Sequence, residues 1–302
     1  MRIVSLLPSA TELLFAIGAG EEVVAVTHEC DHPVAVRSLP AVTSSAIGHR
    51  GQSCAAIDRH IRRAVHQGSS IYRIDEPLLA QLSPDLIVTQ ELCEVCAVAY
   101  AEVQRCARRL PGDVPVLSLE PNTIEDILAT AHVLGEATAH RSGADALAAR
   151  MRAAIAARRA QPAPEPRPAV VCVEWTDPLM AAGHWVPEMV DAAGGRDPLG
   201  RRGGRSEYVD WEQVVAAAPE VMVLMPCGFG LERSLETAAD LTRRPGFDRL
   251  PSARSGRVAA VDGSAYFNRP GPRVVEGLEL LAAIVRGGPG DALPAGAAWV
   301  PL

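Results

Sequence analysis

Residues 2–27 read RIVSLLPSATELLFAIGAGEEVVAVT, and this stretch decides the fold class. The apolar run Arg2–Leu6 predicts a short strand, and Ser9 begins a Ser-Ala-Thr-Glu capping box that opens a helix. Gly18–Gly20 ends that helix, and Val23–Val26 predicts a second strand. Because the Gly-Ala-Gly closes a helix instead of following a strand, it is not a dinucleotide-binding fingerprint. The stretch therefore predicts the first strand–helix–strand unit of a parallel sheet.

The same alternation continues along the chain and starts again after the proline-rich segment QPAPEPRP at residues 161–168. The two halves echo each other, because LLAQLSPDLIVTQELC in the first resembles QVVAAAPEVMVLMPC in the second. This internal similarity predicts two related α/β lobes. Further strands are predicted at Leu86–Thr89, Val114–Leu117, Ala169–Glu174, Val221–Met225 and Val258–Val261. Further helices are predicted at 53–68, 97–110, 186–193 and 273–285, with a long helical region over 124–159 that is interrupted near Gly143.

Composition limits the classes of function. The 302 residues are 48% hydrophobic and 22% charged, with a formal net charge of −7, which is typical of a soluble globular protein and argues against a nucleic-acid binder. No apolar run reaches the length of a membrane helix, and the N-terminus lacks the pattern of a secretion signal. We therefore expect a cytoplasmic protein without membrane insertion, whose seven cysteines are mostly reduced.

Four segments carry a resemblance to a known family: RIVSLLPSATELLFAIGAGEEVVAVT, HWVPEMVDAAGG, VDWEQVVAAAPEVMVLM and SAYFNRPGPRVVEGLELL. In this order they resemble class III periplasmic solute-binding proteins, the vitamin B12 and iron-siderophore binding type with a helical backbone. The resemblance implies two Rossmann-like lobes with parallel sheets, joined by a long rigid helix. It places an N-terminal lobe at residues 1–140, the interlobe helix at 141–160 and a C-terminal lobe at 168–302. The chain would be a leaderless member.

Four cysteines fall just after predicted strands, where ligands of open α/β sheets bind. Cys93 and Cys96 form a C-x-x-C pair, and Cys30 and Cys227 follow strands in the first and second halves. Four thiolates suit zinc or an iron–sulfur cluster, so we predict a shared metal site in the cleft between the lobes. Two alternatives stay open. The C-x-x-C pair also fits a redox dithiol, and the thiols also fit simple packing.

Other side chains near strand ends are candidates for ligand binding. Aromatic rings could wall a large flat ligand such as a corrinoid, His184 could bind a metal, and two arginines could hold ligand carboxylates. Each is also compatible with ordinary lobe packing or a polar contact. The predicted ligand-binding residues are Glu29, Arg73, Glu174, Trp175, His184, Trp185, Tyr266, Phe267 and Arg269.

Three functions remain open from the sequence. The first is a binding protein that holds cobalamin, another corrinoid or another metal-containing ligand between its lobes. The second is a cytoplasmic enzyme with a four-cysteine iron–sulfur cluster or zinc, although no nucleophile elbow, P-loop or H-E-x-x-H motif occurs. The third is an exported binding component, and only in that case do we expect an ABC permease as partner.

Overall fold

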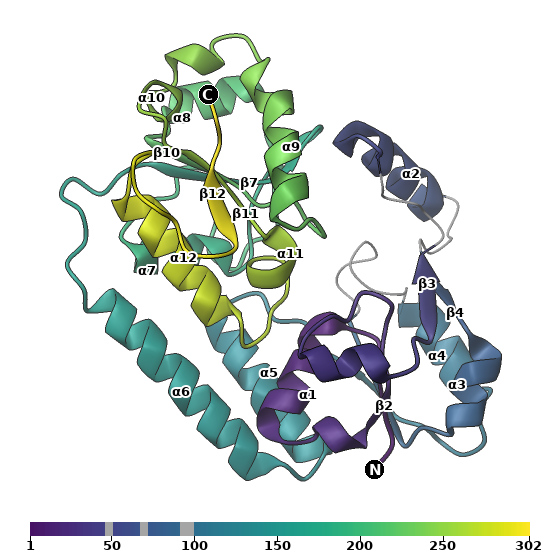
Figure 1. The fold of residues 1–302 in the computed structure, drawn as a ribbon. Helices are drawn as coiled ribbons and strands as arrows, with labels where there is room; N and C mark the ends of the chain where they lie inside the picture. The colour runs from purple at the N-terminus through teal and green to yellow at the C-terminus, as the bar shows by residue number, and fades with distance from the viewer. Residues whose placement is uncertain (46–50, 67–71, 91–99) are drawn as a thin grey trace. The chain divides into compact units, whose positions relative to one another are not determined.

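The computed structural model describes residues 1–45, 51–66, 72–90 and 100–302 (Figure 1). Contacts between Cα atoms divide the chain into two compact units. Lobe 1 contains Met1–Pro121 and Glu125–Arg150, and lobe 2 contains Asn122–Ile124 and Met151–Leu302. The division falls inside helix α6, Arg141–Arg159, within residues 141–160, whose role as an interlobe helix stays a prediction. Its rigidity stays a prediction.

Lobe 1 is built on a four-stranded parallel sheet. Its strand order is β2-β1-β5-β6, with β1 at Ile3–Ser5, β2 at Val23–Ala25, β5 at Leu86–Thr89 and β6 at Val116–Ser118. Every residue of β1 and β5 is buried, as expected for a parallel sheet covered on both faces. The remaining elements are α1 (Pro8–Ile17), η1 (Gly20–Glu22), η2 (Val34–Ser38), the antiparallel pair β3 (Thr43–Ser45) and β4 (Tyr72–Ile74), α2 (Cys54–His66), α3 (Glu76–Leu82), α4 (Tyr100–Ala107) and α5 (Ile124–Ala137).

Helix α1 begins differently from the prediction. Leu7 is its N-cap residue, Pro8 occupies the first turn, and no side chain caps the helix, so the capping box predicted at Ser9 is wrong. Proline at the first helical position needs no N–H partner and presets the helical φ, which moves the start upstream of Ser9. The predicted end is confirmed, because Gly18 closes the helix in the left-handed conformation with φ 97°.

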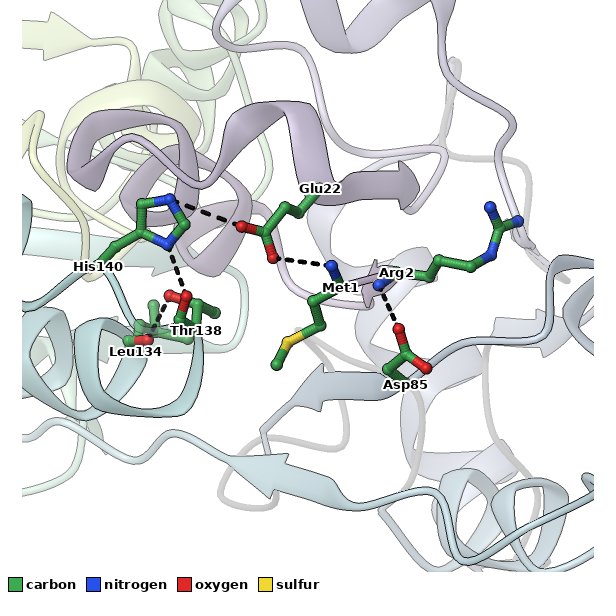
Figure 2. A network of polar contacts seen from close by, with 7 residues as sticks. All are labelled: Met1, Arg2, Glu22, Asp85, Leu134, Thr138 and His140. Atoms are coloured by element: carbon green, nitrogen blue, oxygen red, sulfur yellow. Dashed lines mark hydrogen bonds and ion pairs between the residues drawn. The ribbon is translucent and has the colours of Figure 1, made fainter.

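A chain of polar contacts holds the corner between α5 and α6 (Figure 2). The Glu22 carboxylate lies 3.5 Å from the Met1 amino group and 3.6 Å from Nε2 of His140. Nδ1 of His140 lies 2.7 Å from the carbonyl oxygen of Thr138, whose hydroxyl donates to the Leu134 carbonyl. The corner is therefore tied to the segment that precedes β2.

Lobe 2 contains a six-stranded mixed sheet. Its order is β12-β11-β10-β7-β8-β9, in which the central strands β7, β10 and β11 are parallel and the outer strands β8, β9 and β12 are antiparallel. The parallel centre was predicted, whereas the antiparallel edges were not. The bounds are β7 Val170–Thr176, β8 Leu179–Ala181, β9 Glu207–Tyr208, β10 Val221–Leu224, β11 Val258–Val261 and β12 Ala297–Trp299.

Both faces of the central strands in lobe 2 are covered. One face packs against helix α9 (Leu231–Thr242) in a cluster that includes Val171, Val173, Met222 and Leu224. Alternate residues of the same strands point the other way, toward the side on which α7 (Val186–Ala193) packs against α12 (Val274–Arg286). The remaining helices are α8 (Trp211–Ala217), η3 (Phe247–Arg249), α10 (Pro251–Arg254) and α11 (Gly263–Tyr266).

Candidate functional site

Lobe 1 gathers small polar side chains where β1 and β2 end. Ser5 closes β1, and the buried Thr11 of α1 donates its hydroxyl to Ser5 Oγ at 2.8 Å. The Thr11 hydroxyl also lies 3.2 Å from the Cys30 sulfur, and the hydroxyl of Thr27, just after β2, lies 3.4 Å from it. Cys30 is therefore held between hydroxyl groups at the carboxyl edge of the sheet, as its place after a strand predicted.

The residues beside Cys30 form a second polar contact group. His28 Nδ1 lies 2.8 Å from the Thr43 hydroxyl, and the His28 ring packs 5.4 Å from that of Tyr72. The Glu29 carboxylate lies 3.3 Å from His28 Nε2. Arg73 is exposed on β4. In lobe 1 the Glu29 side chain therefore contacts His28, and Arg73 lies on the adjoining β3–β4 strand pair.

The residues that the structure describes do not test the predicted four-cysteine site. Cys93 and Cys96 lie outside the described residues, while Cys30 and Cys227 have intermediate exposure and belong to different lobes. Within the described ranges, no group of three or more histidine, cysteine, aspartate or glutamate side chains is arranged to hold a metal ion. The zinc or iron–sulfur site therefore stays a prediction.

Lobe 2 places a carboxyl group at the corresponding edge of its sheet. Glu174 lies near the end of β7, and its Oε2 accepts a 2.6 Å hydrogen bond from the Ser206 hydroxyl, just before β9. The Ser206 oxygen in turn accepts the Gly183 N–H at 3.1 Å. Burial raises the pKa of the Glu174 carboxyl above its ordinary value, and the hydrogen bonds from Ser206 and Gly183 only partly oppose that rise.

His184 follows Gly183 and is fixed from several directions. Its backbone has φ 54°, a left-handed conformation that costs energy for a non-glycine residue. The His184 N–H donates to the Gly204 carbonyl, the Gly203 N–H donates to the His184 carbonyl, and Nδ1 lies 3.1 Å from Oδ1 of Asn122. Burial, and then the charge of Arg205, hold the pKa of His184 below its usual range, which favours the neutral imidazole.

An aromatic pair stands next to Glu174. The rings of Trp175 and Phe229 lie 5.3 Å apart at 50°, and the Arg233 guanidinium lies 5.2 Å from the Phe229 ring centre. Trp175 comes from β7, whereas Phe229 and Arg233 come from the loop and helix after β10. Trp175 is only 9% exposed and Phe229 only 6%, so the two rings form a packed aromatic pair with a cation beside it at this edge of the sheet.

The loop between β10 and α9 is closely packed at this edge. The Cys227 N–H donates to the Glu174 carbonyl at 3.2 Å, so the loop lies beside the end of β7. A Cβ on Gly263 would lie 2.6 Å from the Pro226 carbonyl oxygen and 2.8 Å from Asn268 Oδ1. Only glycine fits this approach of the segment after β11 to the loop. Cys227 and the residues after β11 are thus neighbours within lobe 2.

The remaining predicted ligand residues have different degrees of exposure. Tyr266 is half-buried, and the Arg273 guanidinium lies 5.9 Å from its ring centre. Phe267 and Arg269 are only 1% and 9% exposed. Trp185 is also buried, and its indole Nε1 has no hydrogen-bond partner among the described residues. Phe267 therefore belongs to the packed interior, and the ligand contacts predicted for these four residues stay predictions.

Sequence reasoning missed Ser206, Asn122 and Phe229. Ser206 lies 32 positions from Glu174, and Asn122 lies 62 positions from His184, so nothing local connects either pair. Phe229 did carry a signal, because it lies in the segment directly after the predicted strand Val221–Met225 and aromatic residues are scarce in this chain.

The fold is that of a two-lobed α/β protein with polar side chains at the carboxyl ends of its strands, where ligands of open α/β sheets bind. The family model "Periplasmic binding protein" matches residues 3–265, and the chain belongs to this family. Within the described residues, no helix is long and apolar enough to cross a membrane.

Curated and solved relatives agree with this assignment. The chain is 22% identical over 279 residues to the "Vitamin B12-binding protein" of Vibrio parahaemolyticus, covering 92% of this chain and 86% of that protein. The structure of a possible iron-binding (periplasmic solute-binding) protein from Staphylococcus epidermidis superposes with a TM-score of 0.71 at 21% identity, covering 95% and 98% of the two chains. The periplasmic heme-binding protein of Vibrio cholerae gives 0.71 at 19% identity, covering 95% and 99%. The two structural likenesses show the fold alone.

Proposed function

We propose that this protein binds cobalamin, or another metal-containing ligand of similar size, at the carboxyl edges of its sheets. Membership of the periplasmic binding protein family over residues 3–265 carries the proposal. The name of the Vibrio parahaemolyticus relative makes cobalamin the first ligand to test, and the heme-binding relative makes heme the second. An ABC permease as partner is part of the proposal only if the protein is exported, and a cytoplasmic location stays a prediction that cell fractionation tests.

The Trp175–Phe229 pair of lobe 2, whose residues are 9% and 6% exposed, is proposed to form the apolar floor beneath a flat macrocycle. Trp175 lies at the end of β7 with Phe229 beside it, and Glu174 and Ser206 supply polar contacts on the same strand end. Such a combination of apolar walls and a few placed polar groups is typical of small-molecule sites.

Equilibrium dialysis against cyanocobalamin and against hemin, read by their absorbance, tests the proposal. We expect saturable binding of one of the two by the wild type. Trp175→Ala should weaken it at least about fivefold, since an aromatic anchor is worth more than about 1 kcal/mol. Trp299→Ala is the matched control, because Trp299 pairs with Ala259 in the first half of β11, away from the carboxyl edge. No retention of either ligand, or equal weakening by both variants, would contradict the proposal.

A further inference from the structure

Glu174 lies at the edge where the ligand is proposed to bind, and the described residues supply it with no counter-charge. Its hydrogen bonds come from the Ser206 hydroxyl and the Gly183 N–H, and both donors are neutral. No cationic side chain in the described part of the chain forms an ion pair with it, and no charged group contributes to its pKa shift. A shielded carboxylate in such surroundings is stabilised by a cation or by further hydrogen-bond donors.

The direction of the hydrogen bonds fixes the role of the carboxylate. Ser206 donates its hydroxyl proton to Glu174 while its oxygen accepts the Gly183 N–H, so the single donor of Ser206 is already used at Glu174. The ionised Glu174 therefore offers only acceptor sites. Because its side chain keeps part of its surface exposed, a bound ligand can reach it.

Among the described residues, no cationic side chain forms an ion pair with Glu174, and the neighbouring groups have other partners. His184 stands on the same loop as Gly183, with Nδ1 against Asn122. Arg205 precedes Ser206, and its charge acts on His184. Cys227 approaches Glu174 through its backbone N–H, which donates to the main-chain carbonyl and not to the carboxylate.

We propose that Glu174, oriented by Ser206, is a specificity-determining subsite that accepts a hydrogen bond from an N–H group of the ligand, such as a primary amide or an ammonium group, and disfavours a carboxylate at the same place. The inference rests on the proposed function, and it narrows the ligand class to macrocycles that carry amides. A ligand carboxylate here would face a second carboxylate, and like charges in a shielded site repel strongly. Protonation of Glu174 at acid pH supplies a donor and removes that repulsion.

Two corrinoids that share a ring and differ in side-chain charge test the inference. Cobinamide carries amides at the ring periphery, and cobyrinic acid carries carboxylates in their place. We expect the wild type at pH 8 to bind cobinamide at least about tenfold more tightly than cobyrinic acid, and this ratio to shrink toward pH 5. Glu174→Gln should reduce the ratio to within about threefold and remove most of its pH dependence, since glutamine can both donate and accept.

Glu212→Gln is the matched control, because Glu212 is exposed in the first turn of α8 and its loss changes the net charge by the same amount. Glu212→Gln should keep the wild-type ratio of affinities. This result would separate the effect of Glu174 from the effect of the protein's overall negative charge. Circular dichroism and unfolding midpoints establish that both variants fold. A wild type that binds cobinamide but shows the same ratio as Glu174→Gln would overturn the inference and leave the proposed function intact. A wild type that binds neither corrinoid would overturn the corrinoid proposal itself.

Discussion

Replacing Gly143 by alanine should destabilise lobe 1. Gly143 lies in the first turn of α6, where a Cβ would stand 1.9 Å from the Ile17 carbonyl oxygen and 2.7 Å from the Ile17 carbonyl carbon. Contact at normal distance requires α6 and the end of α1 to separate by about 1 Å, and the obstructing atoms are main chain, so no rotamer change relieves the clash. The substitution therefore tests directly how α6 begins on α1.

The size of the effect follows from two opposing contributions. Overpacking a close-packed site costs about 1–3 kcal/mol, and contact with main-chain atoms places Gly143→Ala at the upper end. Alanine is a better helix former than glycine and returns about 1 kcal/mol. We therefore expect a net loss of about 1–2 kcal/mol in the free energy of unfolding.

Urea unfolding followed by far-ultraviolet circular dichroism measures this loss. With a slope near 3 kcal/mol per molar, the midpoint of the lobe 1 transition should fall by about 0.5 M. Gly288→Ala is the control, because no atom lies within 4 Å of the added Cβ, and it should change stability by less than about 0.5 kcal/mol. If Gly143→Ala were as stable as the wild type, the packing of α6 against Ile17 would be wrong.

Three further predictions concern buried polar groups. Glu188→Ala removes the oxygen that accepts the Ile124 N–H at 2.8 Å, so stability in urea should fall by about 1–3 kcal/mol, and an unchanged midpoint would argue against this contact. Burial raises the pKa of the Cys172 thiol well above its ordinary value. Iodoacetamide at pH 8 should therefore leave Cys172 unmodified in the native protein and modify it in urea, as measured by mass spectrometry. Equal rates in both states would refute the burial of Cys172. Because the pKa of Glu174 is raised by folding, the native carboxyl holds its proton more tightly than the unfolded one, and stability is lost as pH rises through the folded pKa. The stability of Glu174→Gln relative to the wild type should therefore grow between about pH 4 and pH 8, whereas a constant difference would show that the carboxyl titrates normally.

Several features of the fold could be predicted because they are local. Strands β5 and β10 are short, continuous apolar runs that lie between turn residues, and such runs identify buried parallel strands. The two-residue strand β9 has both residues exposed, so it carries no apolar pattern, and its pairing with β8 is set by tertiary contacts. The start of α1 was misplaced because Pro8 and the capping residues after it compete for the same position.

The site could be predicted only in part. The sequence shows which residues follow a strand, but the hydrogen-bond partners that orient these residues are distant in the sequence. Glu174 and His184 were both expected near a ligand, and the structure places them on adjoining segments of lobe 2 through Gly183 and Ser206. Neither the hydrogen bond that orients Glu174 nor the left-handed backbone of His184 leaves a trace in the local sequence. Those features depend on where the loop before β9 folds back.

Calorimetric titration of the wild-type protein with cyanocobalamin tests the central claim most directly, namely that this protein binds a metal-containing ligand. The account predicts a saturable heat signal with a dissociation constant in the micromolar range or below, which corresponds to a binding free energy of about −8 kcal/mol or stronger. The absence of heat at high micromolar cyanocobalamin, with hemin equally silent, would contradict it.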